Sequence, residues 1–134
     1  MRTTGTETGE IHGVVTAAEL IDLQRLVRRV PAPPSLVSFA VRLARATRPG
    51  PEAASVTGRY VSWGAGPRAS QYLVLGAKAR AASRGDAMPS VDDVRAVAPA
   101  VLAHRIVLNF EAEADGRGTR DVIQELLKES QGWT

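Results

Sequence analysis

The sequence has no cysteine and only two histidines among its 134 residues. Disulfides, thiolate metal sites and a cysteine nucleophile are therefore excluded, and two histidines are too few for a histidine-built metal cage. No apolar stretch approaches the roughly 20 residues that a membrane-spanning helix needs. Residues 1–5 contain no apolar run, so no secretory signal is predicted and a cytoplasmic location is expected.

Lysine and aromatic residues are also scarce. Lys78 and Lys128 are the only lysines among 17 basic residues, and aromatic residues make up 4% of the chain. With 14 acidic residues the net charge is +3, which permits phosphate or nucleic-acid binding without requiring it. A shortage of aromatic residues, together with abundant alanine, favours closely packed helices over a β-sandwich.

Apolar residues recur at helical spacing and predict an all-α bundle of five or six helices. Thr16 and Glu19 have the spacing of a capping box, and residues 31–34 are proline-rich and end that first helix. Its apolar stripe of Leu20, Leu23, Val27 and Val30 is expected to pack on the second helix, because the turn between them is short. Four further helices are predicted. The first covers residues 35–47, the second runs from the turn at 64–68 to about 83, the third begins after the capping residue Ser90, and the fourth runs from 119 to about 129.

Between these helices, residues 49–66 are predicted to form one long loop with at most a short strand at 59–63. Pro99 predicts a break or kink near Ala98, and residues 106–110 are read as a possible extended segment that would make a minor strand pair. We expect a flexible arm or linker remnant at 1–13, a helical domain over 14–130 and a tail at 131–134.

Few residues suggest catalysis or metal binding. His104 ends a predicted core helix without a nucleophile-elbow sequence near it, so a histidine facing the helix dipole explains it better than a catalytic triad does. His12 lies in the predicted arm and is read as solvated. Glu111, Glu113 and Asp115 alternate along a predicted loop, but their spacing does not supply a calcium loop, so a solvated acidic segment is favoured and no metal site is expected.

The glycine-rich turn at residues 64–68 is the strongest candidate for a ligand site. It has the sequence Gly-Ala-Gly-Pro-Arg and opens a helix, so backbone N–H groups, the positive end of a helix dipole and the Arg68 guanidinium come together. Anions are attracted to this combination, although an ordinary Gly-Pro helix start with a surface arginine has the same pattern. No phosphate-binding motif of the type G-x-x-x-x-G-K-[ST] occurs in the chain.

Two rows of arginines allow a nucleic-acid interpretation. They could follow a phosphate backbone, but acidic residues are interspersed and no aromatic residues lie between them, so the solvated faces of two amphipathic helices are favoured. The rows are Arg25, Arg28 and Arg29, and Arg42, Arg45 and Arg48.

Four segments together resemble the C-terminal lid domain of MoxR-family AAA+ ATPases. They are LIDLQ at 20–24, WGAGPRAS at 63–70, VDDVRAVAPAVLAHRI at 91–106 and LNFEAEA at 108–114. The resemblance covers residues 14–127 and implies a helical lid whose sensor-2 arginine is Arg68, preceded by Gly66 and Pro67. Gly66 stands where this family often has serine, so a side-chain cap is lost there.

The resemblance also implies function and partners. Arg68 would reach the γ-phosphate of ATP, which would be bound with Mg²⁺ in an upstream α/β ATPase domain. The lid would also pack against neighbouring subunits of a ring in a chaperone-like machine. A von Willebrand A-domain protein would be a further partner. Because this sequence lacks the phosphate cradle, we expect no ATP hydrolysis by the chain alone. The alternative is a stand-alone basic helical module that binds nucleic acid or a protein.

Overall fold

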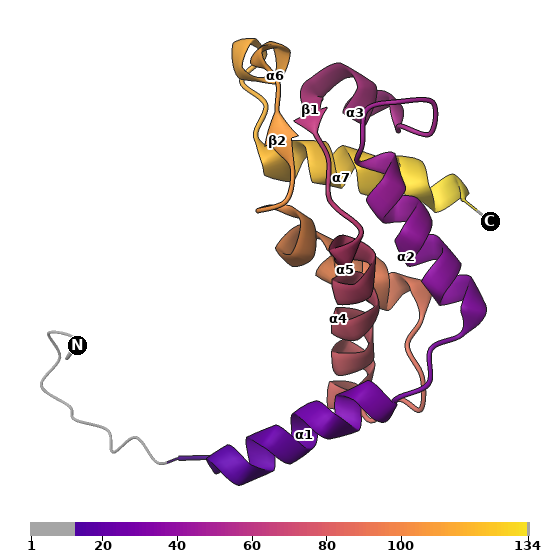
Figure 1. The fold of residues 1–134 in the computed structure, drawn as a ribbon, viewed down its shortest axis with the longest axis vertical. Helices are drawn as coiled ribbons and strands as arrows, with labels where there is room; N and C mark the ends of the chain where they lie inside the picture. The colour runs from indigo at the N-terminus through magenta and orange to yellow at the C-terminus, as the bar shows by residue number, and fades with distance from the viewer. Residues whose placement is uncertain (1–12, 134) are drawn as a thin grey trace, which may run out of the picture.

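The structure is a computed structural model that describes residues 13–133, so nearly all of the expected arm lies outside the described residues (Figure 1). It confirms the all-α class, with a two-stranded antiparallel sheet as the minor β element. The described part contains seven α-helices, and two short ones raise the number above five or six. The helices are α1 (Ala17–Arg29), α2 (Pro34–Ala46), α3 (Ser55–Tyr60), α4 (Arg68–Arg84), α5 (Val91–Leu102), α6 (Phe110–Ala114) and α7 (Thr119–Glu129), and the strands are β1 (Val61–Trp63) and β2 (Val107–Leu108).

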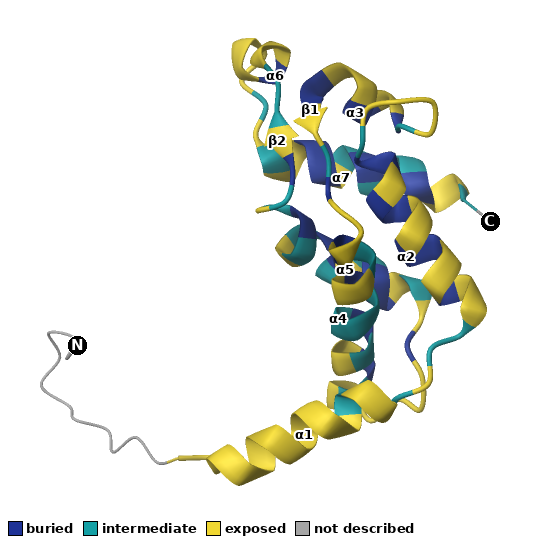
Figure 2. Ribbon diagram, viewed as in Figure 1, coloured by how far each residue is buried: buried dark blue, intermediate teal, exposed yellow. Residues whose placement is uncertain are grey.

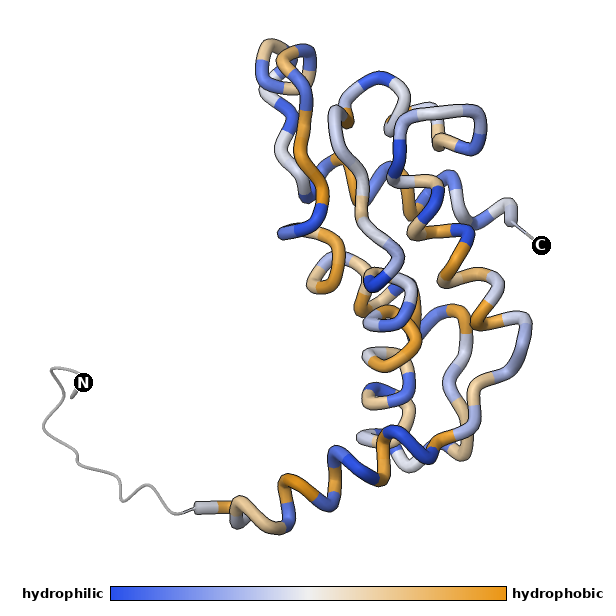
Figure 3. Tube along the Cα trace, in the orientation of Figure 1, coloured by the Kyte–Doolittle hydropathy of each residue, from blue (hydrophilic) through white to orange (hydrophobic). Residues whose placement is uncertain are grey.

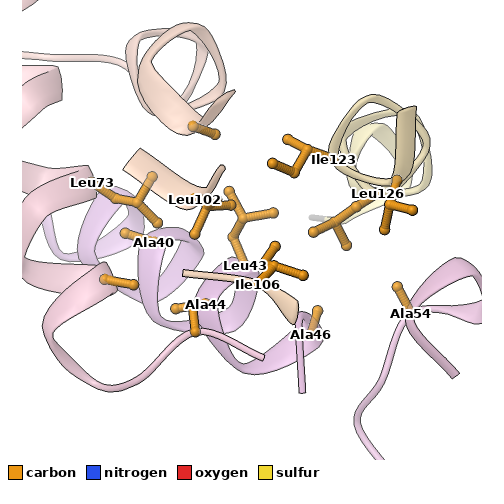
Figure 4. Packing of buried hydrophobic residues seen from close by; sticks show 14 of the residues in the cluster. Ala40, Leu43, Ala44, Ala46, Ala54, Leu73, Leu102, Ile106, Ile123 and Leu126 are labelled. Atoms are coloured by element: carbon orange, nitrogen blue, oxygen red, sulfur yellow. The ribbon is translucent and has the colours of Figure 1, made fainter. Parts of the chain in front are cut away.

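The core lies where α4 and α5 pack together, with α2 on one side and α7 across one end (Figures 1 and 4). Small residues allow the α4–α5 approach, since a Cβ added to Gly76 would lie 3.2 Å from the Val97 side chain. Fully buried aliphatic side chains fill the space between the four helices, and at ~25 cal/mol per Å² of apolar surface this burial is the main stabilising contribution. They include Leu43, Leu73, Leu102, Ile123 and Leu126.

The predicted long loop is wrong in part, because residues 55–60 form α3. The first N–H groups of α3 are capped by a side chain far along the sequence. Glu129, the last residue of α7, accepts hydrogen bonds from the Ser55 N–H at 3.0 Å and the Val56 N–H at 3.1 Å. The strand that follows is shorter than the predicted 59–63. It pairs with β2 in the register Val61↔Leu108 and Trp63↔Val107, as the extended reading of 106–110 indicated.

The predicted break at Pro99 is also wrong, since α5 is continuous from Val91 to Leu102. Proline inside a helix removes one backbone hydrogen bond and costs ~3 kcal/mol. Buried contacts before and after it, from Val94, Ala98 and Leu102, hold both halves of α5 against the core. Tertiary packing therefore outweighs the local penalty.

The first helix forms as predicted, with the capping box between Thr16 and Glu19, but it does not pack into the core. No residue of α1 is buried, and its main contact is with α4 rather than with α2. Figure 1 shows α1 lying across one end of α4 and projecting to the side, and Figure 2 shows it exposed along most of its length. The expected α1–α2 packing is wrong because residues 30–33 extend the chain between the two helices instead of folding it back.

The C-terminal residues pack on α2. A short 3-10 helix, Ser130–Gly132, brings Trp133 beside Phe39 with a ring-centroid separation of 6.0 Å, and the Arg42 guanidinium lies 4.6 Å from the Trp133 ring centroid. These contacts extend the core past α7. Among the described helices, none combines the length and the apolar character needed to cross a bilayer.

Candidate functional site at the Arg68 turn

The turn before α4 is wedged against the end of α2. A Cβ added to Gly64 would lie 2.2 Å from the Thr47 carbonyl oxygen and 2.6 Å from the Arg48 Cα, and both of these are backbone atoms. No other residue type fits at that separation, so glycine is required here by close approach. Gly66, two residues later, has open space around it.

Two side chains at the end of α2 hold Ala65, the next residue of the turn, by hydrogen bonds to its N–H and carbonyl groups. The Thr47 hydroxyl accepts a hydrogen bond from the Ala65 N–H at 2.9 Å and donates one to the Ala44 carbonyl at 2.7 Å. Arg48 donates from Nε to the Ala65 carbonyl at 2.7 Å. Thr47 and Ala65 are both fully buried, so water cannot replace these bonds. The turn is thus a rigid support for the residues that follow it.

The first turn of α4 places Arg68 at the surface. The helix starts after Pro67 without a side-chain cap, and the Ser70 hydroxyl donates back to the Pro67 carbonyl at 2.7 Å. The Arg68 side chain is exposed, and it takes part in none of the ion pairs found within residues 13–133. Those pairs use Arg25, Arg45, Arg59, Arg80, Arg84, Arg95 and Arg117. The sequence-predicted trio of Gly66, Pro67 and Arg68 is therefore adjacent and accessible.

Thr47→Val should lower the free energy of unfolding by about 1–3 kcal/mol, because it leaves the buried Ala65 N–H without an acceptor. The matched control is Thr57→Val in α3. Thr57 is 1% exposed, and its hydroxyl has no hydrogen-bond partner within the described residues, so this change should be neutral or stabilising. Urea denaturation of both variants measures the difference. Equal losses would show that the Thr47 hydroxyl does not hold the turn.

A groove runs along α4. Gln71, Tyr72 and Leu75 recur at helical spacing and therefore share one face of α4. That face forms one wall of a cavity of about 530 Å³, and the other walls come from α1 and α2. The lining includes Arg28, Val37, Val41 and Lys78.

The other sequence candidates do not assemble into a site. His104 is exposed just beyond the end of α5, beside Arg105. The acidic residues do not lie in the loop that was predicted: Glu111 and Glu113 are part of α6, and Asp115 caps its C-terminal end. Arg59 binds Glu111 at 2.7 Å and Asp115 at 2.9 Å. Within residues 13–133, no three potential ligands are grouped in a way that could hold a metal ion.

The second arginine row is largely engaged in the fold itself. Arg45 pairs with Glu52 at 2.6 Å, Arg48 binds the Ala65 carbonyl, and Arg42 lies over Trp133. A surface that follows a phosphate backbone needs guanidinium groups available to the ligand. The nucleic-acid interpretation therefore gains no support from this helix.

Asp93 lies in the first turn of α5, three residues after the predicted cap Ser90, and its burial could not be predicted from the sequence. The carboxylate is only 3% exposed and pairs with Arg84 at 2.7 Å and Arg80 at 3.1 Å. It also caps α5, accepting from the Ser90 N–H at 2.9 Å. The hydrogen bond from Arg84, with smaller contributions from Ser90, lowers the pKa of Asp93 to about 2, while burial acts in the opposite direction. This cluster ties the end of α4 to the start of α5.

Comparison with known proteins decides the family. Residues 53–126, more than half of the chain, match the AAA lid domain. The chain belongs to the AAA lid domain family. The matched residues include the whole Arg68 turn, all of α4 and α5, and most of α7, whereas Thr47 and Arg48, which hold the turn, lie before the matched segment.

Longer relatives agree with the predicted MoxR resemblance. The AAA lid chain is 33% identical over 117 residues to Chaperone MoxR1 of Mycobacterium tuberculosis, covering 86% of this chain and 31% of that protein. It is 38% identical over 84 residues to Protein MoxR of Methylorubrum extorquens, covering 59% and 24%. A Cytophaga hutchinsonii crystal structure, provisionally assigned as an ATPase, aligns with a TM-score of 0.74 and 32% identity over 83% of this chain and 34% of that one. The chain thus spans between 24% and 34% of the length of these proteins.

Proposed function

We propose that this lid closes over ATP held by a MoxR-type α/β ATPase domain and that Arg68 is its sensor-2 arginine. The observation that carries the proposal is an exposed guanidinium on a turn fixed by Gly64, Thr47 and Arg48. A rigidly supported cation that reaches a transferring phosphoryl group stabilises the charge that develops there, without reorganisation during the reaction. Lid position would then depend on whether the γ-phosphate is present.

The residues of this chain fit part of an ATP site. Arg68 can meet a phosphate anion, whereas the sequence has no Walker-type phosphate loop. The phosphate cradle and the ligands for Mg²⁺ would therefore belong to the α/β domain, which supplies the nucleotide and the metal. This division supports the expectation that the chain alone does not turn over ATP. The same proposal includes packing of the lid against neighbouring subunits of a ring. It also includes a chaperone-like role with a von Willebrand A-domain partner.

The test is Arg68→Ala in a MoxR-type ATPase that carries this chain as its lid. We expect kcat for ATP hydrolysis to fall about 100-fold, the typical effect of removing one preorganised donor to the transition state. ADP affinity should change far less, because ADP lacks the γ-phosphate. Arg120→Ala removes an exposed arginine from α7 and serves as the control. Unchanged kcat in Arg68→Ala would refute the sensor-2 assignment.

A further inference from the structure

The N-terminal half of α1 carries an apolar surface that the described part of the chain leaves half-exposed. Leu20, Ile21 and Leu23 in this half are each 49% exposed, and Leu26, in the C-terminal half, is 52% exposed. Figure 3 shows apolar and polar residues alternating along this projecting helix. Exposed leucines gathered on one helix are typical of a protein-binding surface rather than of a solvated helix.

The spacing of these residues matches a helix-pairing seam. Leu20, Leu23, Val27 and Val30 follow one another at intervals of three, four and three, the a and d positions of a coiled coil. Val27 and Val30 are partly buried at the end of α1 that meets α4. Only the C-terminal part of the seam is therefore used within one copy of the chain.

The charges of α1 are separated along its length. Its N-terminal half carries Glu19 and Asp22 and no cation, while its C-terminal half carries Arg25, Arg28 and Arg29 and no anion. When two such helices run antiparallel, each acidic half lies over the other helix's basic half, and the two helix dipoles oppose each other favourably. A parallel pair would place like charges together. The charge pattern of α1 is thus complementary to itself in the antiparallel direction.

The groove beside α1 extends this complementarity. Val37 and Val41 are each 40% exposed in its wall, and Arg28 and Lys78 supply positive charge at its edge. Lys78 also donates to the Arg28 carbonyl at 3.3 Å, which ties the C-terminal end of α1 to α4. An antiparallel partner helix would bring its acidic, leucine-bearing half to this basic, apolar groove.

We propose that α1 is a self-association element. Two copies of the chain pair through antiparallel α1 helices about a two-fold axis, and the N-terminal half of each helix covers the groove of the other copy. The contact is isologous, since both copies use the same surface. It involves neither Arg68 nor ATP, so it stands or falls separately from the proposed function.

Sedimentation equilibrium of the full chain tests the proposal. We expect a concentration-dependent mass that approaches twice the monomer mass of 14.2 kDa. Leu23→Glu should leave a monomer at the same concentrations, whereas Ala18→Glu adds the same charge on the opposite side of α1 and should leave the dimer intact. Circular dichroism confirms folding, which neither change should disturb because α1 contributes no buried residue. A monomer throughout, or a dimer that survives Leu23→Glu, would overturn the proposal.

Cross-linking tests the direction of pairing. The chain has no cysteine, so a single introduced thiol reports on itself alone. Gln24 lies near the middle of α1, where an antiparallel helix meets its own copy, so Gln24→Cys should give a disulfide-linked dimer on mild oxidation. Ala18→Cys lies on the opposite face and should stay monomeric on denaturing gels. Equal cross-linking of the two variants would contradict the antiparallel arrangement.

Discussion

Gly64→Ala is expected to lower the free energy of unfolding by at least about 3 kcal/mol, the upper end of the usual cost of overpacking. The added methyl group would lie 2.2 Å from the Thr47 carbonyl oxygen and 2.5 Å from the carbonyl carbon. A flexible side chain could rotate away from such a contact, but these are backbone atoms at the end of α2. The turn must therefore separate from α2, breaking the bonds that Thr47 and Arg48 make to Ala65.

Thermal unfolding measures the effect, and Gly66→Ala is the matched control in the same turn. A Cβ at Gly66 would meet no heavy atom within 4 Å, so that variant should unfold within a few degrees of the wild type. For a chain of this size, 3 kcal/mol corresponds to a decrease in Tm of about 10 °C. A Gly64→Ala protein as stable as Gly66→Ala would mean that the turn can move away from α2, and a rigid support for Arg68 would then be excluded.

Asp93→Ala should cost about 3 kcal/mol. It removes a nearly fully buried carboxylate together with its bonds to Arg84, Arg80 and the Ser90 N–H. Deleting one member of a buried pair typically costs 3–5 kcal/mol, and the lower end applies because both arginines are about half exposed and regain water. Asp92→Ala is the control, since that carboxylate is 86% exposed in its pair with Arg95 and should contribute less than about 0.5 kcal/mol.

The same group makes stability depend on pH. The pKa of Asp93 is about 2 in the folded chain against an ordinary value of 3.8, so its contribution is complete above about pH 5 and is lost as the pH falls toward 2. The loss should amount to about 1–2 kcal/mol, allowing for the partial solvation of Arg84. Urea denaturation at pH 5 and pH 2.5 measures it. Asp93→Asn should show a smaller decrease over this interval, and an equal decrease would assign the acid sensitivity to other groups.

Local signals were sufficient wherever the stabilising group lies within one turn of the residue that it serves. The Thr16–Glu19 capping box and the Ser90 cap follow this pattern, and both were predicted. The short helix α6 also has a local cap, because the Asn109 side chain accepts from the Ala112 N–H at 3.0 Å. That signal was present in the sequence and was missed because the acidic residues suggested a loop.

Other features depend on residues far apart in the sequence. The cap of α3 is Glu129, more than 70 residues away, and the Pro99 position is tolerated only because α5 packs on α4 at both ends. The wedge of Gly64 under Thr47 likewise exists only once α2 and the turn meet. Arg68 was proposed as a site residue from its glycine-rich helix start and from the resemblance to a family motif, whereas the rigidity of its support could be found only in the structure.

The positions of the two tryptophans give the protein two separate fluorescent reporters. Trp63, 74% exposed in β1, immediately precedes the Gly64 wedge, while Trp133 is half-buried against Phe39. Trp133 should emit at shorter wavelength and shift to the red on unfolding, whereas Trp63 should already emit as it would in water. In a Trp133→Phe background, the remaining emission would report changes at the Arg68 turn with little contribution from global unfolding. The proposed closure of the lid could therefore be tested optically without an added label.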